Sequence, residues 1–244
     1  MNTNKRLAGV LLHPTMLPGA HGIGDFGKGA RDFLELLGRM DVSLWQILPL
    51  GPTGYGDSPY AARSSFAGNE LLIDLYDLAI NGWIDTAELL SAPRFPDDAV
   101  DFEQVSAWKR PLLVRAAGAF LHEAEKAERK EYQDFCISQQ YWLDDYALYE
   151  VLCTHYGDTR WYSVWDKDIA LRAPEALKRW RTVQAAAIEN VKVRQFFFYR
   201  QWQALKVYAH KKGISIIGDL PIYVASDSAD AWSHRHLMSF DAQG

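Results

Sequence analysis

The chain has 244 residues, of which 48% are apolar and 23% are charged, and its formal net charge is −5. Charges of both signs are interspersed with enough apolar residues for a folded core, which argues against intrinsic disorder. The acidic balance argues against a nucleic-acid-binding surface, because such surfaces carry clusters of basic residues.

The cysteines and the N-terminus indicate the compartment. Cys136 and Cys153 lie 17 residues apart without a Cys-x-x-Cys motif, so neither a disulfide framework nor a structural zinc site is predicted. The apolar run Leu7–Leu12 is too short for the core of a signal peptide, and prolines follow it at once. No stretch approaches the roughly 20 apolar residues that cross a bilayer. We therefore expect a soluble cytoplasmic protein without a membrane partner.

The first part of the chain has a strand–helix–strand pattern. Residues 6–13 form a short apolar run closed by Pro14, which is typical of a buried strand. Residues 24–40 carry apolar side chains at helical spacing, and Asp25 is placed to favour the helix N-terminus. Residues 43–50 form a second strand-like run. Short connections between these elements imply a parallel βαβ unit.

The next strand-like run is 213–220, and it follows a helical stretch at 191–212. Helical stripes at 108–130 and 132–155 occupy much of the interval, which is far too long for a simple crossover between strands. The sequence therefore predicts an α/β fold with a largely helical subdomain inserted between the second and third strands.

This pattern divides the chain into three segments. They are residues 1–80 with the first two strands, residues 81–190 with the inserted helical subdomain, and residues 191–244 with a helix, the third strand and the following loop. Three strands cannot close a (β/α)8 barrel. Either a small open sheet or one part of a barrel is implied.

A Gly-x-Gly-x-x-Gly motif at Gly22–Gly27 invites a dinucleotide-binding interpretation. In that fold the glycines begin directly at the strand end, so that the backbone can wrap the pyrophosphate. Here eight residues separate His13 from the motif. The second strand also ends in prolines where the ribose-binding acid would stand, so nucleotide binding is not predicted.

Histidines offer a second set of possible ligands, with His234 and His236 alternating and His13 and His210 as further partners. No carboxylate or cysteine completes a recognisable ligand set. We therefore predict no metal site.

Residues 51–69 directly follow the second strand and have the composition of a sugar-binding loop. Glycines and prolines stiffen the turn, and Tyr55 and Tyr60 project from it. An aromatic ring offers an apolar face to the C–H side of a pyranose, while polar groups pair with its hydroxyls. The short polar side chains of the loop are Asp57, Ser58, Ser64, Ser65 and Asn69. The alternative is a surface loop whose tyrosines cap the core.

Asp219 closes the third strand-like run. A carboxylate at the carboxyl end of a parallel strand faces the side where α/β folds bind their ligands. The alternative is an aspartate that caps a helix or pairs with a cation. Farther along, Asp227 precedes a short helical pattern and is predicted to cap that helix.

Several sequence segments, in this order along the chain, resemble the N-terminal part of the members of one protein family. They are Ala8–Thr15, Leu17–Gly19, His21–Asp25, Ser43–Gln46 and Leu48–Tyr60, followed much later by Ile216–Asp230. Together they resemble the amylomaltases, which are the 4-α-glucanotransferases of glycoside hydrolase family 77. The resemblance spans almost the whole chain.

The resemblance implies a (β/α)8 barrel of which this chain is the N-terminal part, with about three barrel strands. It also implies transfer of α-1,4-glucan segments between maltodextrins, with glucose as a further acceptor, by a retaining double displacement. That scheme requires no metal or organic cofactor. The oligomeric state is left open.

The resemblance implies roles for individual site residues only where the motifs of this chain align with those of the family. Tyr60 matches the family tyrosine that stacks beneath the sugar ring at the cleavage site, and Ser58 matches a serine that contacts the glucan nearby. Asp219 matches a substrate-site aspartate that is not the nucleophile. Tyr55 matches an aromatic residue at a peripheral glucan contact. Tyr223 stands where relatives carry an aromatic residue of open role.

The sequence departs from the family pattern in one large respect. The resemblance implies an aspartate nucleophile and a glutamate acid/base in later barrel segments, and the Arg-x-Asp-His-Phe-Arg signature of the nucleophile does not occur here. No catalytic residue is therefore assigned, and both carboxylates are expected beyond Gly244. We expect the 244-residue chain alone to be inactive. The alternative is a non-catalytic maltodextrin-binding or regulatory remnant of such an enzyme.

Overall fold

The computed structural model describes residues 6–240, except for the side chain of Tyr55. These residues form two compact units, each built from three separate parts of the chain. The first unit comprises residues 6–50, 69–116 and 197–220, and the second comprises 51–68, 117–196 and 221–240. The division of the sequence into 1–80, 81–190 and 191–244 follows the order of the elements and stays a prediction.

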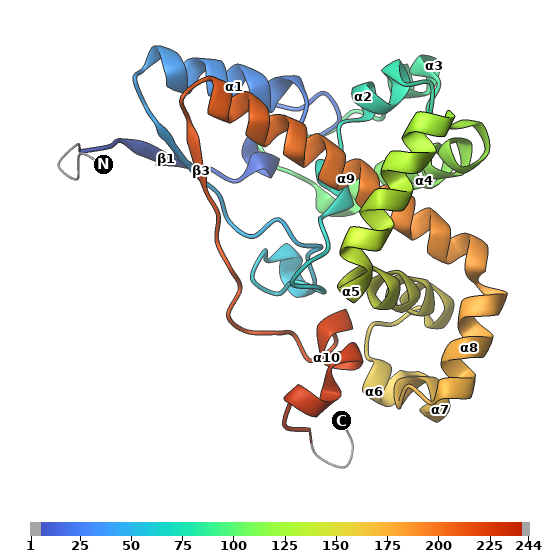
Figure 1. Ribbon diagram of the computed structural model, residues 1–244. Coiled ribbons are helices and arrows are strands. Elements are labelled where there is room, and N and C mark those ends of the chain that lie inside the picture. Colours follow the sequence, from blue (N-terminus) through green and yellow to red (C-terminus); the bar gives the residue numbers. More distant parts are fainter. Residues whose placement is uncertain (1–5, 241–244) are drawn as a thin grey trace. The chain divides into compact units, whose positions relative to one another are not determined.

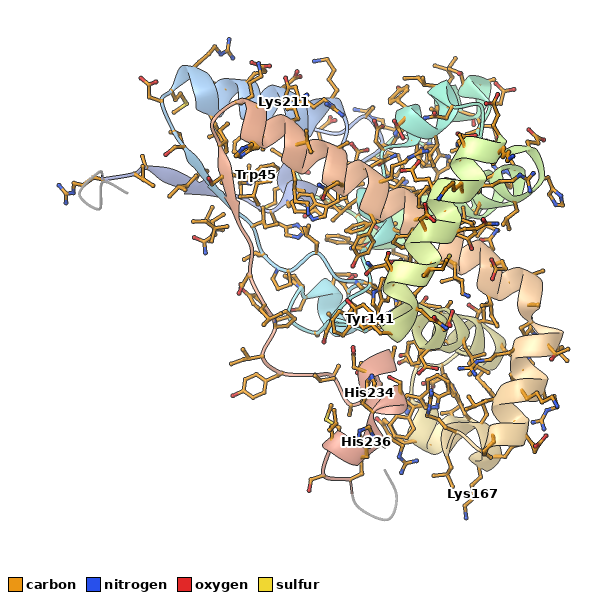
Figure 2. All side chains as sticks on the ribbon, in the orientation of Figure 1. Trp45, Tyr141, Lys167, Lys211, His234 and His236 are labelled. Carbon is orange, nitrogen blue, oxygen red and sulfur yellow. The ribbon has the colours of Figure 1, made fainter. Side chains whose placement is uncertain are left out.

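The first unit contains a parallel three-stranded sheet in the order β1 (Gly9–Leu11), β2 (Leu44–Gln46) and β3 (Ser215–Ile217). All three predicted strands are confirmed, although each is shorter than its apolar run. The central row of the sheet aligns Val10, Trp45 and Ile216. Trp45 is fully buried on β2 (Figure 2).

Helix α1 (Lys28–Arg39) follows β1 and covers the sheet, with the ring of Phe33 5.3 Å from that of Trp45. Helix α9 (Ala185–Lys211) lies beside α1, and Lys212 just after it pairs with Glu35 at 2.7 Å (Figure 1). The unit also contains α2 (Leu75–Ile80), α3 (Thr86–Leu90) and the short 3-10 turns η1 (Pro14–Met16) and η3 (Glu70–Leu72).

The start of α1 corrects one expectation. The helix begins at Lys28 with Gly27 as its N-cap, and not at residue 24. Asp25 is buried outside the first helical turn, where its Oδ1 accepts a hydrogen bond from the backbone N–H of Gly27 at 3.0 Å. Its second oxygen lies 3.7 Å from Nζ of Lys109. The carboxylate of Asp25 therefore lies between the N-cap residue of α1 and a buried lysine.

The second unit is mostly helical, as the sequence predicts. It contains α5 (Lys126–Tyr156), α6 (Trp161–Val164), α7 (Lys167–Ala170), α8 (Pro174–Val183) and α10 (Ala229–Ser233), with the turns η2 (Tyr55–Asp57) and η4 (Arg235–Leu237). Helix α4 (Phe102–Glu123) and helix α9 contribute residues to both units.

The break between the two long helices lies six to seven residues earlier than the sequence pattern indicated. Helix α4 ends at Glu123 and α5 begins at Lys126, where the backbone N–H of Glu125 donates to Glu128 at 3.0 Å. Pro111 lies inside α4 and does not end it. Within residues 6–240, no helix is both long and apolar enough to cross a membrane.

A charged cluster lies inside the first unit. The Lys109 side chain is fully buried, and its Nζ donates to the carbonyl of Leu71 at 2.7 Å and pairs with Asp25. Asp74, which caps α2 by accepting from the N–H of Tyr76 at 2.9 Å, also faces this lysine. Burial, and secondarily the carboxylate of Asp25, raises the pKa of Asp74 to about 6.

We expect Asp74→Asn to remove a pH-dependent part of the stability. The folded-state pKa of about 6 lies above the ordinary 3.8, so the folded protein binds this proton more tightly than the unfolded chain. Stability from Asp74 therefore rises as pH falls from about 6 to about 4, by on the order of 3 kcal/mol. Urea unfolding of both proteins at pH 4 and pH 7 measures the difference. An identical pH dependence in the two proteins would contradict the shift.

Candidate functional site

The predicted sugar-binding loop is a closed turn in the second unit, and residues 51–68 are called the Tyr60 loop below. An antiparallel bridge joins Thr53 to Ala62, and the N–H of Gly54 donates to the carbonyl of Ala61 at 2.9 Å. A Cβ at position 54 would lie 2.5 Å from that carbonyl oxygen. Only glycine permits such a close approach of the two sides of the turn.

Tyr60 is the last residue of the turn that Gly54 and Ala61 close. Gly56 and Asp57 both have positive φ angles, 67° and 52°, which turn the chain sharply at η2. The Ser58 hydroxyl accepts a hydrogen bond from the N–H of Tyr60 at 3.3 Å, so it helps to orient the tyrosine. The Tyr60 side chain is 49% exposed. The side chain of Tyr55 lies outside the described residues.

Two polar side chains that the sequence suggested for sugar hydroxyls serve the backbone instead. The buried Ser64 hydroxyl accepts from the N–H groups of Phe66 and Ala67, both at 3.2 Å. Asn69 belongs to the first unit, where its buried Oδ1 caps η3 by accepting from Leu71 at 3.0 Å. Buried polar groups need partners, and here the nearest ones are backbone N–H groups.

An ion pair that the sequence pattern did not indicate holds the second half of the loop. Arg63 lies 3.7 Å from Glu150 of α5, and its Nε donates to the carbonyl of Thr53 at 3.1 Å. The carboxylate of Glu150 raises the pKa of the Arg63 guanidinium, which opposes the effect of burial. No local motif could have revealed this pair, because its partners are far apart in the sequence.

Asp219 belongs to the first unit and follows the last residue of β3 by two positions. Its side chain is exposed, and its Oδ1 accepts from the N–H of Leu220 at 2.9 Å. The carboxylate thus stands at the carboxyl end of a parallel strand, as the sequence predicts. Its grouping with Tyr60 in one site stays a prediction, because each residue is described within its own unit.

Near the carboxyl ends of β1 and β2 lies His13, which the sequence offered only as a possible metal ligand. Its Nδ1 lies 2.8 Å from the Thr15 hydroxyl, and its Nε2 lies 3.3 Å from the carbonyl of Pro49. Burial lowers the pKa of this histidine. A neutral imidazole between these two partners joins the segments that follow the two strands.

The segment before α10 corrects the predicted helix cap. Ser228 caps the helix by accepting from Ala231 at 3.1 Å, and Asp227 does not. The Asp227 carboxylate instead accepts from the hydroxyl of Thr159 at 2.6 Å, and its carbonyl accepts from the hydroxyl of Tyr149. The helix begins one residue later than the pattern suggested because tertiary partners engage Asp227.

The alternating histidines lie on the last described segment, His234 just after α10 and His236 within η4 (Figure 2). Their ring centroids are 6.0 Å apart. Among residues 6–240, no group of three or more His, Cys, Asp or Glu side chains is arranged to hold a metal ion. Tyr223, whose role the sequence left open, is strongly exposed.

The chain resembles known proteins over nearly its whole length. Residues 12–244 match the family model described as 4-alpha-glucanotransferase. The 4-alpha-glucanotransferases of Synechocystis sp. and Thermus thermophilus are 45% and 43% identical to it, and each alignment covers 98% of this chain and 47% of the relative. The chain thus spans about half the length of the curated relatives that it matches.

Solved structures give the same result for the fold. The amylomaltase from Streptococcus agalactiae, in complex with acarbose, superposes with a TM-score of 0.92 at 39% identity, over 98% of this chain and 48% of that one. An amylomaltase from Corynebacterium glutamicum, with a TM-score of 0.65 at 17% identity over 94% of this chain and 32% of its own, shares the fold. The predicted fold class is confirmed, since the parallel three-stranded sheet with its helices is part of a (β/α)8 barrel. With the family model matched over most of its residues, the chain belongs to the 4-alpha-glucanotransferase family.

Proposed function

We propose that the protein to which this chain belongs transfers α-1,4-glucan segments between maltodextrins, with glucose as a further acceptor. The observation that carries this proposal is the family match over residues 12–244. The Tyr60 loop adds chemical support, because it presents an exposed aromatic ring on a turn closed by its own backbone bonds.

The proposed chemistry is a retaining double displacement. A carboxylate attacks the anomeric carbon while a carboxylic acid protonates the leaving oxygen, and a glycosyl-enzyme forms. The acceptor's 4-hydroxyl then attacks this intermediate and gives its proton back to the carboxylate formed in the first step. The two carboxyl groups need to lie roughly 5–5.5 Å apart. We place both of them beyond Gly244, in a continuation of the barrel.

The residues of this chain then bind and orient the glucan. Tyr60 stacks against the apolar face of a glucose ring, and Ser58 holds the tyrosine backbone and contacts the sugar. Asp219 accepts hydrogen bonds from sugar hydroxyls at the end of β3, and Tyr55 provides a peripheral contact. None of the four attacks the glycosidic bond or protonates it.

Replacing Tyr60 by alanine tests the binding role. We expect the affinity of the chain for maltoheptaose, measured by isothermal titration calorimetry, to fall about tenfold, because a stacked ring contributes about 0.5–1.5 kcal/mol beyond its buried area. Tyr76→Ala is a suitable control, since Tyr76 is 43% exposed and lies on α2, outside the loop. Full affinity in the Tyr60 variant would contradict the role of the loop.

Transfer itself is tested on the same preparation with maltotriose. We expect a sequence-verified 244-residue chain to release no glucose, and release would refute the placement of both carboxylates beyond Gly244. Reading the coding sequence past codon 244 completes the test. A genuine stop codon with no barrel sequence downstream, together with maltoheptaose binding, would favour a maltodextrin-binding remnant over an enzyme.

A further inference from the structure

The C-terminal end of the Tyr60 loop is bound by a glutamine from a distant helix. The buried side chain of Gln195 in α9 accepts from the N–H of Gly68 at 2.8 Å and donates to its carbonyl at 3.0 Å. These two bonds satisfy both backbone groups of one loop residue, as a neighbouring strand would. A backbone fixed in this way loses its freedom to turn about Gly68.

A second contact comes from α10. Oδ2 of Asp230 accepts from the N–H of Ser65 at 2.8 Å, and the N–H of Ala229 donates to the carbonyl of Arg63 at 2.8 Å. Burial raises the pKa of Asp230, while the Ser65 hydrogen bond lowers it. This carboxylate is thus partly withdrawn from water, and its hydrogen bond to the loop compensates for the lost solvation.

A third contact comes from α5. Besides the ion pair of Arg63 with Glu150, the ring of Phe66 packs edge-on against Tyr141, with the centroids 5.3 Å apart. All these contacts lie within the second unit. The loop is therefore bound at four successive places by residues that follow it in the sequence by more than 70 positions.

Such an arrangement has a consequence for binding. Fixing the residues of a mobile loop costs conformational entropy, and a loop that is ordered before its ligand arrives avoids that cost during binding. We propose that the helical part of the second unit preorganises the Tyr60 loop in the conformation that binds its glucan, with Gln195 and Asp230 as positioning residues. This inference rests on the proposed function of the loop.

The chain contains a matched control for Gln195. Gln201 lies six residues farther along α9 and is also buried. Its side chain makes the same pair of bonds to a different segment, accepting from the N–H of Asp74 at 2.7 Å and donating to its carbonyl at 3.1 Å. Asp74 belongs to the first unit, outside the Tyr60 loop. Truncating either glutamine removes a pair of backbone bonds, and Gln201→Leu also removes a third bond, from Nε2 to Oδ2 of Asp77 at 2.9 Å. Only the substitution of Gln195 releases the loop.

The experiment compares Gln195→Leu with Gln201→Leu, and Asp230→Ala with Asp230→Asn. Asparagine keeps an oxygen that accepts from Ser65, whereas alanine does not. Maltoheptaose affinity is measured by calorimetry, and deuterium exchange of residues 63–68 is followed by mass spectrometry. We expect Gln195→Leu and Asp230→Ala to weaken the affinity about tenfold and to accelerate exchange in this segment. In Gln201→Leu and Asp230→Asn, we expect the maltoheptaose affinity and the exchange rate of residues 63–68 to stay within about twofold of the parent values.

Each outcome decides the question. Equal affinity and equal exchange in Gln195→Leu and Gln201→Leu would overturn the proposal, as would equal behaviour of the two Asp230 variants. If Gln195→Leu does not fold, the Asp230 pair decides alone. If the parent chain itself does not bind maltoheptaose, the proposed glucan-binding role of the Tyr60 loop fails, whereas the exchange of residues 63–68 still shows whether these side chains order the loop.

Discussion

Replacing Lys109 by methionine is expected to lower the free energy of unfolding by about 3–5 kcal/mol, because breaking a buried ion pair leaves its carboxylate without a counter-ion. The lysine is fully buried, donates to Leu71 at 2.7 Å and lies 3.7 Å from Asp25. Without it, Asp25 and the nearby Asp74 remain inside the first unit and have to take up protons to stay there.

Urea unfolding at pH 7 measures this loss. Lys130→Met is the control, since Lys130 pairs with Asp134 at 2.6 Å on an exposed helix surface. Exposed pairs of this kind contribute only about 0–1 kcal/mol. A second variant, Lys109→Met with Asp25→Asn, is expected to recover part of the loss, because it removes one of the unpaired carboxylates. If Lys109→Met unfolds at the same urea concentration as the parent, the cluster has no stabilising role.

Trp45→Ala is expected to cost about 3–5 kcal/mol, the range for removing a large aromatic side chain from a packed core. Trp45 is fully buried on the central strand, packs against Phe33 of α1, and donates from Nε1 to the carbonyl of Leu12 at 2.8 Å (Figure 2). Its loss would leave a cavity between the sheet and α1 and an unpaired carbonyl beside it.

Trp45→Phe separates these two contributions. Phenylalanine fills most of the space but cannot donate to Leu12, so we expect it to cost about 1–3 kcal/mol through the unsatisfied carbonyl. Thermal and urea unfolding of both variants give the two values. An alanine variant no less stable than the phenylalanine variant would show that packing at this position matters little.

The sequence predicted the sheet and the main helices well, because their signal is local. The apolar run around Val10, the helical spacing before Arg39 and the run around Trp45 are sufficient for a parallel βαβ unit, and the structure confirms it. The same holds for the long helices α5 and α9. The predicted helix boundaries were less accurate, because helix caps depend on single residues, such as Gly27 before α1 and Glu125 before α5.

The candidate site was only partly predictable. The exposure of Tyr60 on a stiff turn and the position of Asp219 after β3 agree with the sequence pattern, and their roles in glucan binding stay predictions. The sequence suggested that Ser64 and Asn69 contact sugar hydroxyls. It also suggested that Asp227 caps a helix. Each instead serves a backbone group or a distant side chain that the sequence pattern did not reveal.

The sequence by itself determined the family, the parallel strands and the helical character of the insertion, because apolar periodicity and ordered motifs are properties of neighbouring residues. Only the tertiary structure decided which of two similar glutamines on α9 binds the Tyr60 loop, and that Asp25 faces Lys109 as well as the N-cap of α1. The distant partners among these lie 84 to 127 positions apart in the chain, and packing alone brings them together. A buried polar side chain is satisfied by whatever the fold places beside it.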